Sequence, residues 1–133
     1  MDARDLFLDQ HAALHSAAVG GNKLSAAERT FAGLTDEQMR GRPREDLNSL
    51  AWLLWHIARA EDVMVNRLLA GRPQVFERAA AEGAFGPRTE QILKAFPGRP
   101  RTFMLSGTAL FHSAGHMGEA ATVRTAGGFG TGV

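Results

Sequence analysis

The chain has 133 residues, 44% of them hydrophobic, which suits one globular domain with a substantial core. Its formal net charge is +1 and its arginines are scattered without a basic run, which argues against a nucleic-acid-binding surface. The sequence contains no cysteine, which excludes disulfides, a thiolate nucleophile and a cysteine-ligated metal site.

The beginning of the sequence, Met1-Asp-Ala-Arg-Asp-Leu, lacks the cationic and apolar regions of a signal peptide. No apolar run approaches the roughly 18–20 residues that a membrane span needs. A chain without cysteine also fits a reducing compartment. We therefore expect a cytoplasmic protein that has neither a membrane nor a nucleic acid as a partner.

The first predicted helix runs from about Ala3 to Val19, followed by Gly20-Gly21-Asn22, which favours a helix end. Its stripe comprises Leu8, His11, Ala12, His15 and Val19. Residues 23–44 form a long connector. Within it, Thr35-Asp-Glu-Gln38 is typical of a capping box that opens a short turn of helix.

The second predicted helix runs from Ser49 to about Ala70 with Asn48 as its N-cap, and it has the strongest helical periodicity in the chain. Its apolar face comprises Leu50, Leu53, Leu54, Ile57, Ala60, Met64 and Leu68. The opposite face comprises Trp55, Arg59, Asp62 and Asn66. His56 falls at the edge of the apolar face and Glu61 falls inside it, where a carboxylate needs a partner.

A short third helix is predicted over residues 89–96, and a long last helix is predicted from Thr102 to Ala126. The inner stripe of the last helix comprises Leu105, Ala109, His112, His116, Glu119, Ala120 and Val123. Gly127 to Val133 is glycine-rich and is predicted to be a flexible tail. Because strand-type alternation is absent, we expect an all-α domain over residues 1–126 and a tail over 127–133.

His112 and His116 are four residues apart, so in a helix their imidazoles lie one turn apart on the same face and can hold one metal ion. Two ligands rarely make a protein metal site, and His56 is the best candidate for the third. Three histidines would give an open site of the catalytic type. The alternative is that the histidines only pack in the core or at its edge.

Four other polar residues have more than one interpretation. His11 and His15 share the same four-residue spacing and could form a second site, supply a ligand, or lie at the surface or a pocket rim, which the pattern favours. Glu119 either orients an imidazole through its free N–H or pairs with an arginine such as Arg124. For Glu61, burial favours a structural hydrogen bond.

Two segments resemble the second and fourth helices of the DinB-like family of four-helix bundles. They are Leu47-Asn-Ser-Leu-Ala-Trp-Leu-Leu-Trp-His-Ile-Ala-Arg-Ala-Glu61 and Leu110-Phe-His-Ser-Ala-Gly-His-Met-Gly-Glu-Ala-Ala-Thr-Val-Arg124, and Thr35-Asp-Glu-Gln-Met fits the connector before the second helix. The resemblance implies an up-and-down-type four-helix bundle that binds a divalent metal, zinc or nickel, through the family positions occupied here by His56, His112 and His116. Compared with the family, this chain is short between Pro73 and Pro100, and a partner subunit could supply the missing cover.

The resemblance also implies an activity and an assembly. Characterised relatives are enzymes that use low-molecular-weight thiols such as mycothiol or bacillithiol, and dimers are common among them. The leading hypothesis is therefore a metal-dependent thiol S-transferase that forms a homodimer and acts on a small-molecule substrate. The alternatives are a metal-dependent hydrolase, a non-catalytic metal- or small-molecule-binding bundle related to stress, and a bundle without metal.

Overall fold

All regular secondary structure is helical in residues 1–16, 24–75 and 110–130, which are the residues that the computed structural model describes. This confirms the predicted all-α class for that part of the chain. None of its helices has the length and apolar character that crossing a bilayer demands. The helices are α1 (Ala3–His15), α3 (Ala26–Phe31), α4 (Asp36–Arg40), α5 (Leu50–Asp62), η1 (Val63–Leu69) and α9 (Ser113–Ala126).

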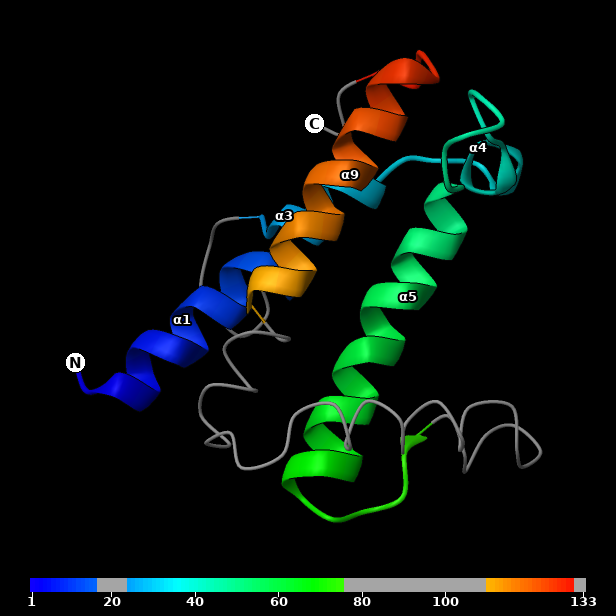
Figure 1. Ribbon diagram of the computed structural model, residues 1–133. Helices are drawn as coiled ribbons and strands as arrows, with labels where there is room; N and C mark the ends of the chain where they lie inside the picture. Colours follow the sequence, from blue (N-terminus) through cyan, green and yellow to red (C-terminus); the bar gives the residue numbers. More distant parts are fainter. Residues whose placement is uncertain (17–23, 76–109, 131–133) are drawn as a thin grey trace.

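The helices α5 and α9 lie side by side and run in opposite directions, with α4 at the beginning of α5 and α1 near the beginning of α9 (Figure 1). The core lies between α5 and α9 at the end where α5 begins. It consists of the fully buried Leu50, Leu53, Ala120 and Val123. Partly buried side chains from the connector and the chain end cover it, namely Phe31, Leu34, Met39, Leu47 and Phe129.

Capping boxes begin both short helices of the connector. The predicted box at Thr35 is confirmed, because its hydroxyl accepts from the N–H of Gln38 and the Gln38 side chain accepts from the N–H of Thr35. Ser25 and Glu28 make the same reciprocal pair at the beginning of α3. The pair satisfies backbone N–H groups that a helix leaves unpaired at its first turn. We did not predict α3 from the sequence.

The helix α1 ends at His15, not at the predicted Val19. Ser16 leaves the helical region, with φ −160° and ψ 121°, although its N–H still donates to the carbonyl of Ala12. Serine stabilises non-helical conformations through its hydroxyl, which explains an end before the glycines. The predicted cap at Gly20–Asn22 lies outside the described residues, as do the predicted third helix at 89–96 and the last helix before residue 110.

The predicted N-cap of the second helix was wrong by one residue. Ser49 caps α5, because its side chain accepts from the N–H of Trp52 at 3.2 Å. Asn48 and Ser49 are comparably good caps, so local sequence alone does not separate them. The helix continues through the wider turns of η1, and Gly71 follows with φ +62°, a conformation that favours glycine.

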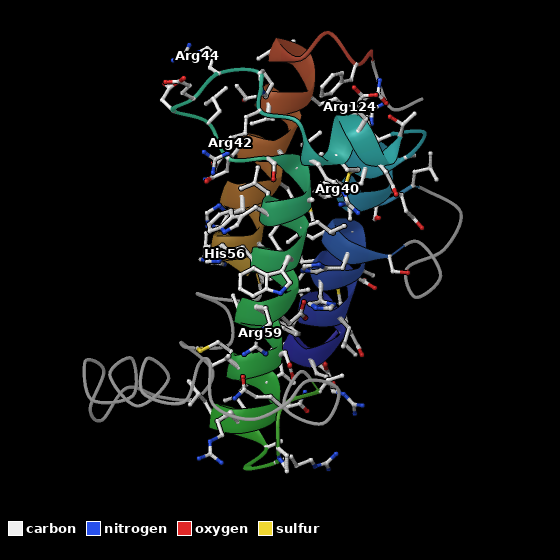
Figure 2. The ribbon with its side chains drawn as sticks, turned by 90° about the vertical axis from the view of Figure 1, so that its right-hand side faces the viewer. Arg40, Arg42, Arg44, His56, Arg59 and Arg124 are labelled. Carbon is white, nitrogen blue, oxygen red and sulfur yellow. The ribbon has the colours of Figure 1, made fainter. Side chains whose placement is uncertain are left out.

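Arg59, which the helical pattern placed opposite the apolar face, is buried. It is labelled on α5 in Figure 2 and is only 7% exposed. Its Nη2 donates to Oε1 of the buried Gln74 at 2.7 Å, and its Nη1 pairs with Asp62 at 2.9 Å. After Gly71 the chain turns back, so that Gln74 covers this side of α5. The helical pattern could not show a contact made by a segment outside the helix.

Arg124 connects α9 to the connector and to the chain end. It is 7% exposed, and its Nη1 donates to the carbonyls of Thr30 at 2.8 Å and Ala32 at 2.9 Å. Its Nε donates to the carbonyl of Gly130 at 2.6 Å. The segment that we predicted to be a flexible tail is thus held against the helices as far as Gly130.

Candidate metal centre

The antiparallel register of α5 and α9 places three histidines opposite one another. His56 lies three residues after the core residue Leu53 on α5, and His116 lies four residues before the core residue Ala120 on α9. Each step is about one helical turn, so each histidine lies on the same face of its helix as the core residue from which it is counted. Because α5 and α9 run in opposite directions, both steps lead away from the core toward the same level of the helix pair.

The three imidazole rings converge at that level. Their centroids are 4.5 Å apart for His112 and His116, 4.7 Å for His56 and His116, and 5.1 Å for His56 and His112. One nitrogen from each ring lies within 4.8 Å of the other two. Figure 2 shows His56 extending from α5 toward the side on which α9 lies. Nitrogens bound to one zinc ion at about 2.0–2.1 Å stand about 3.4 Å apart, so the rings are close enough to share an ion.

Glu119 holds the ring of His116. Its Oε2 lies 2.9 Å from Nδ1 of His116, and its Oε1 accepts from Nδ2 of Asn48 at 2.9 Å. A carboxylate next to Nδ1 favours the tautomer with the proton on that nitrogen, which leaves the lone pair on Nε2 for a metal. Of the two interpretations of Glu119, its geometry matches the orienting role, because Arg124 binds backbone carbonyls instead.

His112 is a neutral base at neutral pH. Burial lowers its pKa below the usual 6.5, and the neighbouring His116 and His56 lower it further, because a second positive charge there is unfavourable. Its Nδ1 is buried and has no hydrogen-bond partner among the described residues. An unsatisfied buried polar atom costs about 1–3 kcal/mol, and a metal ion is one partner that could accept its lone pair.

The carboxyl group of Glu119 is ionised at neutral pH. Burial alone would raise its pKa, but the hydrogen bonds from Asn48 and His116, together with the positive potential of His116 and His56, outweigh burial and lower it. The site therefore combines three imidazole rings with one ionised carboxylate beside them.

Trp52 stacks on His56, with ring centroids 4.6 Å apart and planes inclined by 11°. The two residues are four positions apart on α5, so their side chains lie on the same face of the helix. The indole restricts the orientation of the imidazole on one side. Trp52 is nevertheless 39% exposed, so it also presents apolar surface beside the histidines.

Glu61 is the partner of His11 and His15, the other histidine pair. Nε2 of His11 contacts Oε1 of Glu61, and Nε2 of His15 lies 3.6 Å from Oε2. The side chains are 29%, 15% and 23% exposed, in the order His11, His15 and Glu61. The interpretation of the two histidines as surface or pocket-rim residues stays a prediction, because both are partly exposed. The predicted partner for Glu61 is confirmed.

Asn48 has a role at the histidine site that was not predicted from the sequence. Its amide donates to a carboxylate 71 positions later in the chain, and it was assigned instead as a helix cap. The only local indication of this contact is that Asn48 is a polar residue shortly before the helix that carries His56. Periodicity within one helix gives no information about a contact with another helix.

Comparison with known protein families matches residues 23–110 to the DinB superfamily. The match covers more than half of the 133 residues, includes His56 and ends just before His112. Neither the curated proteins nor the solved structures contain a significant match to this chain.

Proposed function

We propose that this chain, which belongs to the DinB superfamily, is a metal-dependent enzyme whose ion is bound by His56, His112 and His116. The observation that carries the proposal is the convergence of three imidazoles from α5 and α9, with one nitrogen of each within 4.8 Å of the others. Zinc and nickel are the metals that the resemblance implies, and both accept imidazole ligands.

The reaction that we propose is the transfer of a low-molecular-weight thiol, of the mycothiol or bacillithiol type, to a small electrophilic substrate. A divalent ion bound by three neutral imidazoles keeps its full charge and lowers the pKa of a thiol bound beside it. The sequence has no cysteine, so the attacking sulfur has to come from a small molecule.

Each residue around the site has a separate task in this proposal. Burial keeps His112 neutral, which is the form that binds a metal. Glu119 and Asn48 fix the tautomer and the angle of His116. Trp52 restricts His56 and offers an apolar surface on which the carbon skeleton of a substrate can rest.

The position of Glu119 bears on the alternative of a closed, non-catalytic metal site. A closed site needs a fourth protein ligand, supplied by another side chain or by Glu119. Both of its oxygens are engaged, one by Asn48 and one by His116. This arrangement supports an open coordination position, which a transferase needs. A hydrolase would use the same open position for water.

The proposal extends to the fold and the assembly. We propose that residues 89–96 complete an up-and-down-type four-helix bundle as a short third helix. We also propose that two chains associate as a homodimer in which the partner covers the side left by this short helix. The cysteine-free sequence supports a cytoplasmic location. Light scattering on the purified chain measures the assembly.

The test uses protein purified without an affinity tag, stripped with a chelator and reloaded with zinc or nickel. Mycothiol, bacillithiol and glutathione are each supplied with monochlorobimane as the electrophile, and the fluorescent thioether is followed. We expect metal-dependent formation of the thioether with at least one thiol. Thr122→Ala is the matched control on α9, because Thr122 is exposed and its hydroxyl bonds only within its own helix.

His116→Ala should abolish the reaction and Thr122→Ala should retain it. Hydrolysis of a nitrophenyl ester is measured on the same samples. Metal-dependent ester hydrolysis without thioether formation would replace the transferase by a hydrolase. Bound metal without either reaction would favour the non-catalytic binding bundle.

A further inference from the structure

The second histidine cluster is built from two helices, like the first. His11 and His15 lie one turn apart on α1, with ring centroids 4.5 Å apart, and Glu61 reaches them from α5 across 50 positions of sequence. One nitrogen from each ring and one carboxylate oxygen all lie within 4.8 Å of one another. Phe7 stacks against His11 at a centroid distance of 6.0 Å and restricts that ring from one side.

The donor set has the chemistry of a metal site. Two histidines and one glutamate form one of the common three-ligand sets for zinc and for other divalent transition metals. The spacing of four residues on one helix orients both imidazoles toward the same point. The carboxylate of Glu61 supplies a negative charge. The three proposed ligands of the other cluster are all histidines and supply none.

The carboxylate of Glu61 lies close to both rings. Nε2 of His15 is 3.6 Å from Oε2 of Glu61, which is longer than a hydrogen bond. Within the described residues, no lysine or arginine forms an ion pair with Glu61, which is 23% exposed. A divalent cation between the three side chains would neutralise this carboxylate and accept a lone pair from each ring.

The two clusters are separate sites on opposite sides of α5. His56 and Glu61 are five residues apart, which corresponds to a rotation of about 140° and a rise of about 7.5 Å along the helix. His56 faces α9, whereas Glu61 faces α1. The clusters share no residue. Loss of one site therefore removes no ligand from the other.

We propose that His11, His15 and Glu61 form a second binding site, for a divalent transition-metal cation such as Zn²⁺ or Co²⁺, which fastens α1 to α5. This site rests on residues other than those of the proposed catalytic ion and does not depend on the function proposed above. It connects the first helix of the chain to the helix that carries His56.

The test counts bound ions in the tag-free, metal-stripped chain titrated with Co²⁺ and separately with Zn²⁺. Elemental analysis gives the number of ions, and the visible absorption of Co²⁺ reports the ligand environment. The wild-type chain should bind two ions. Glu61→Gln keeps the size of the side chain but removes its charge, and it should bind one ion. His11→Gln should also bind one ion, leaving the three-histidine ion in place.

Gln10→Ala is the matched control, because Gln10 is the exposed neighbour of His11 on α1, and this variant should still bind two ions. Far-UV circular dichroism confirms that each variant is folded. The double variant His112→Ala/His116→Ala should retain one ion, and adding Glu61→Gln to it should remove that ion.

The outcomes distinguish the two proposals. One ion that is lost in His116→Ala and kept in both Glu61→Gln and His11→Gln would overturn the second site and leave the catalytic site standing. One ion that is kept in His116→Ala and lost in Glu61→Gln would overturn the three-histidine site and leave the second site standing. A wild-type chain that binds no ion would overturn both.

Discussion

Replacement of Glu119 tests whether the carboxylate positions a metal-binding histidine. Glu119→Gln removes the negative charge from a group that lies 2.9 Å from Nδ1 of His116 and accepts from Asn48 at 2.9 Å. The glutamine oxygen can still accept from His116, and the amide of Asn48 can rotate to present its oxygen to the new NH₂ group. The geometry can thus survive while the charge is lost.

The expected loss of metal affinity follows from this contact. Replacing the hydrogen-bonded partner of a metal-binding histidine typically weakens metal binding by about 10–100-fold. That factor corresponds to about 1.4–2.7 kcal/mol of binding free energy. Glu119→Ala also removes the hydrogen-bond acceptor and should fall at the upper end of the range. Asn48→Ala removes only one of the two contacts of the carboxylate and should have the smallest effect.

The assay is a competition between the stripped protein and a chromophoric chelator for Zn²⁺, with circular dichroism to confirm folding. The order of affinity should be wild type, Asn48→Ala, Glu119→Gln and Glu119→Ala, from strongest to weakest. If Glu119→Ala binds as tightly as the wild type while His116→Ala does not bind, the carboxylate has no positioning role and the reasoning fails.

Three further results should follow. His112→Ala and His116→Ala should each abolish stoichiometric metal binding at the three-histidine site with little loss of helix content, as measured by elemental analysis and circular dichroism. In metal-free protein, the lowered pKa of His112 means that the unfolded chain binds the proton more readily than the folded one, so stability is full above pH 6.5 and falls below it. Urea unfolding across that pH range measures the slope, which His112→Gln should reduce. Leu53→Ala should lower the free energy of unfolding by about 2–5 kcal/mol, because Leu53 is fully buried, and Arg59→Ala by about 3–5 kcal/mol, because it removes the cation that pairs with the largely buried carboxylate of Asp62. Urea denaturation of both variants checks these values, and a loss below 1 kcal/mol would contradict the packing described.

The features that the sequence predicted well are those set by residues within one turn of helix. The four-residue spacing of His112 and His116 determines their shared face, and Thr35 and Gln38 form their capping box in whatever fold surrounds them. The apolar face of the second helix identified Leu50 and Leu53 as core residues, and both are fully buried. Such patterns require only local geometry.

The features that were not predicted from the sequence depend on contacts between distant segments. Glu61 needed a partner, but its own helix could not show that His11 would supply one from 50 positions away. The burial of Arg59 was not predictable from its helix, because its cover, Gln74, comes from the segment after the helix. Asn48 was predicted only to cap the second helix, and its contact with Glu119 depends on the approach of α9.

Diffraction from metal-loaded crystals, recorded on both sides of the absorption edge of the bound metal, tests the central claim most directly. The anomalous signal should show an ion bonded to one nitrogen each of His56, His112 and His116, with a coordination position open to solvent or to a thiol. An ion bound elsewhere, with the ring of His56 turned away from the other two, would contradict the claim.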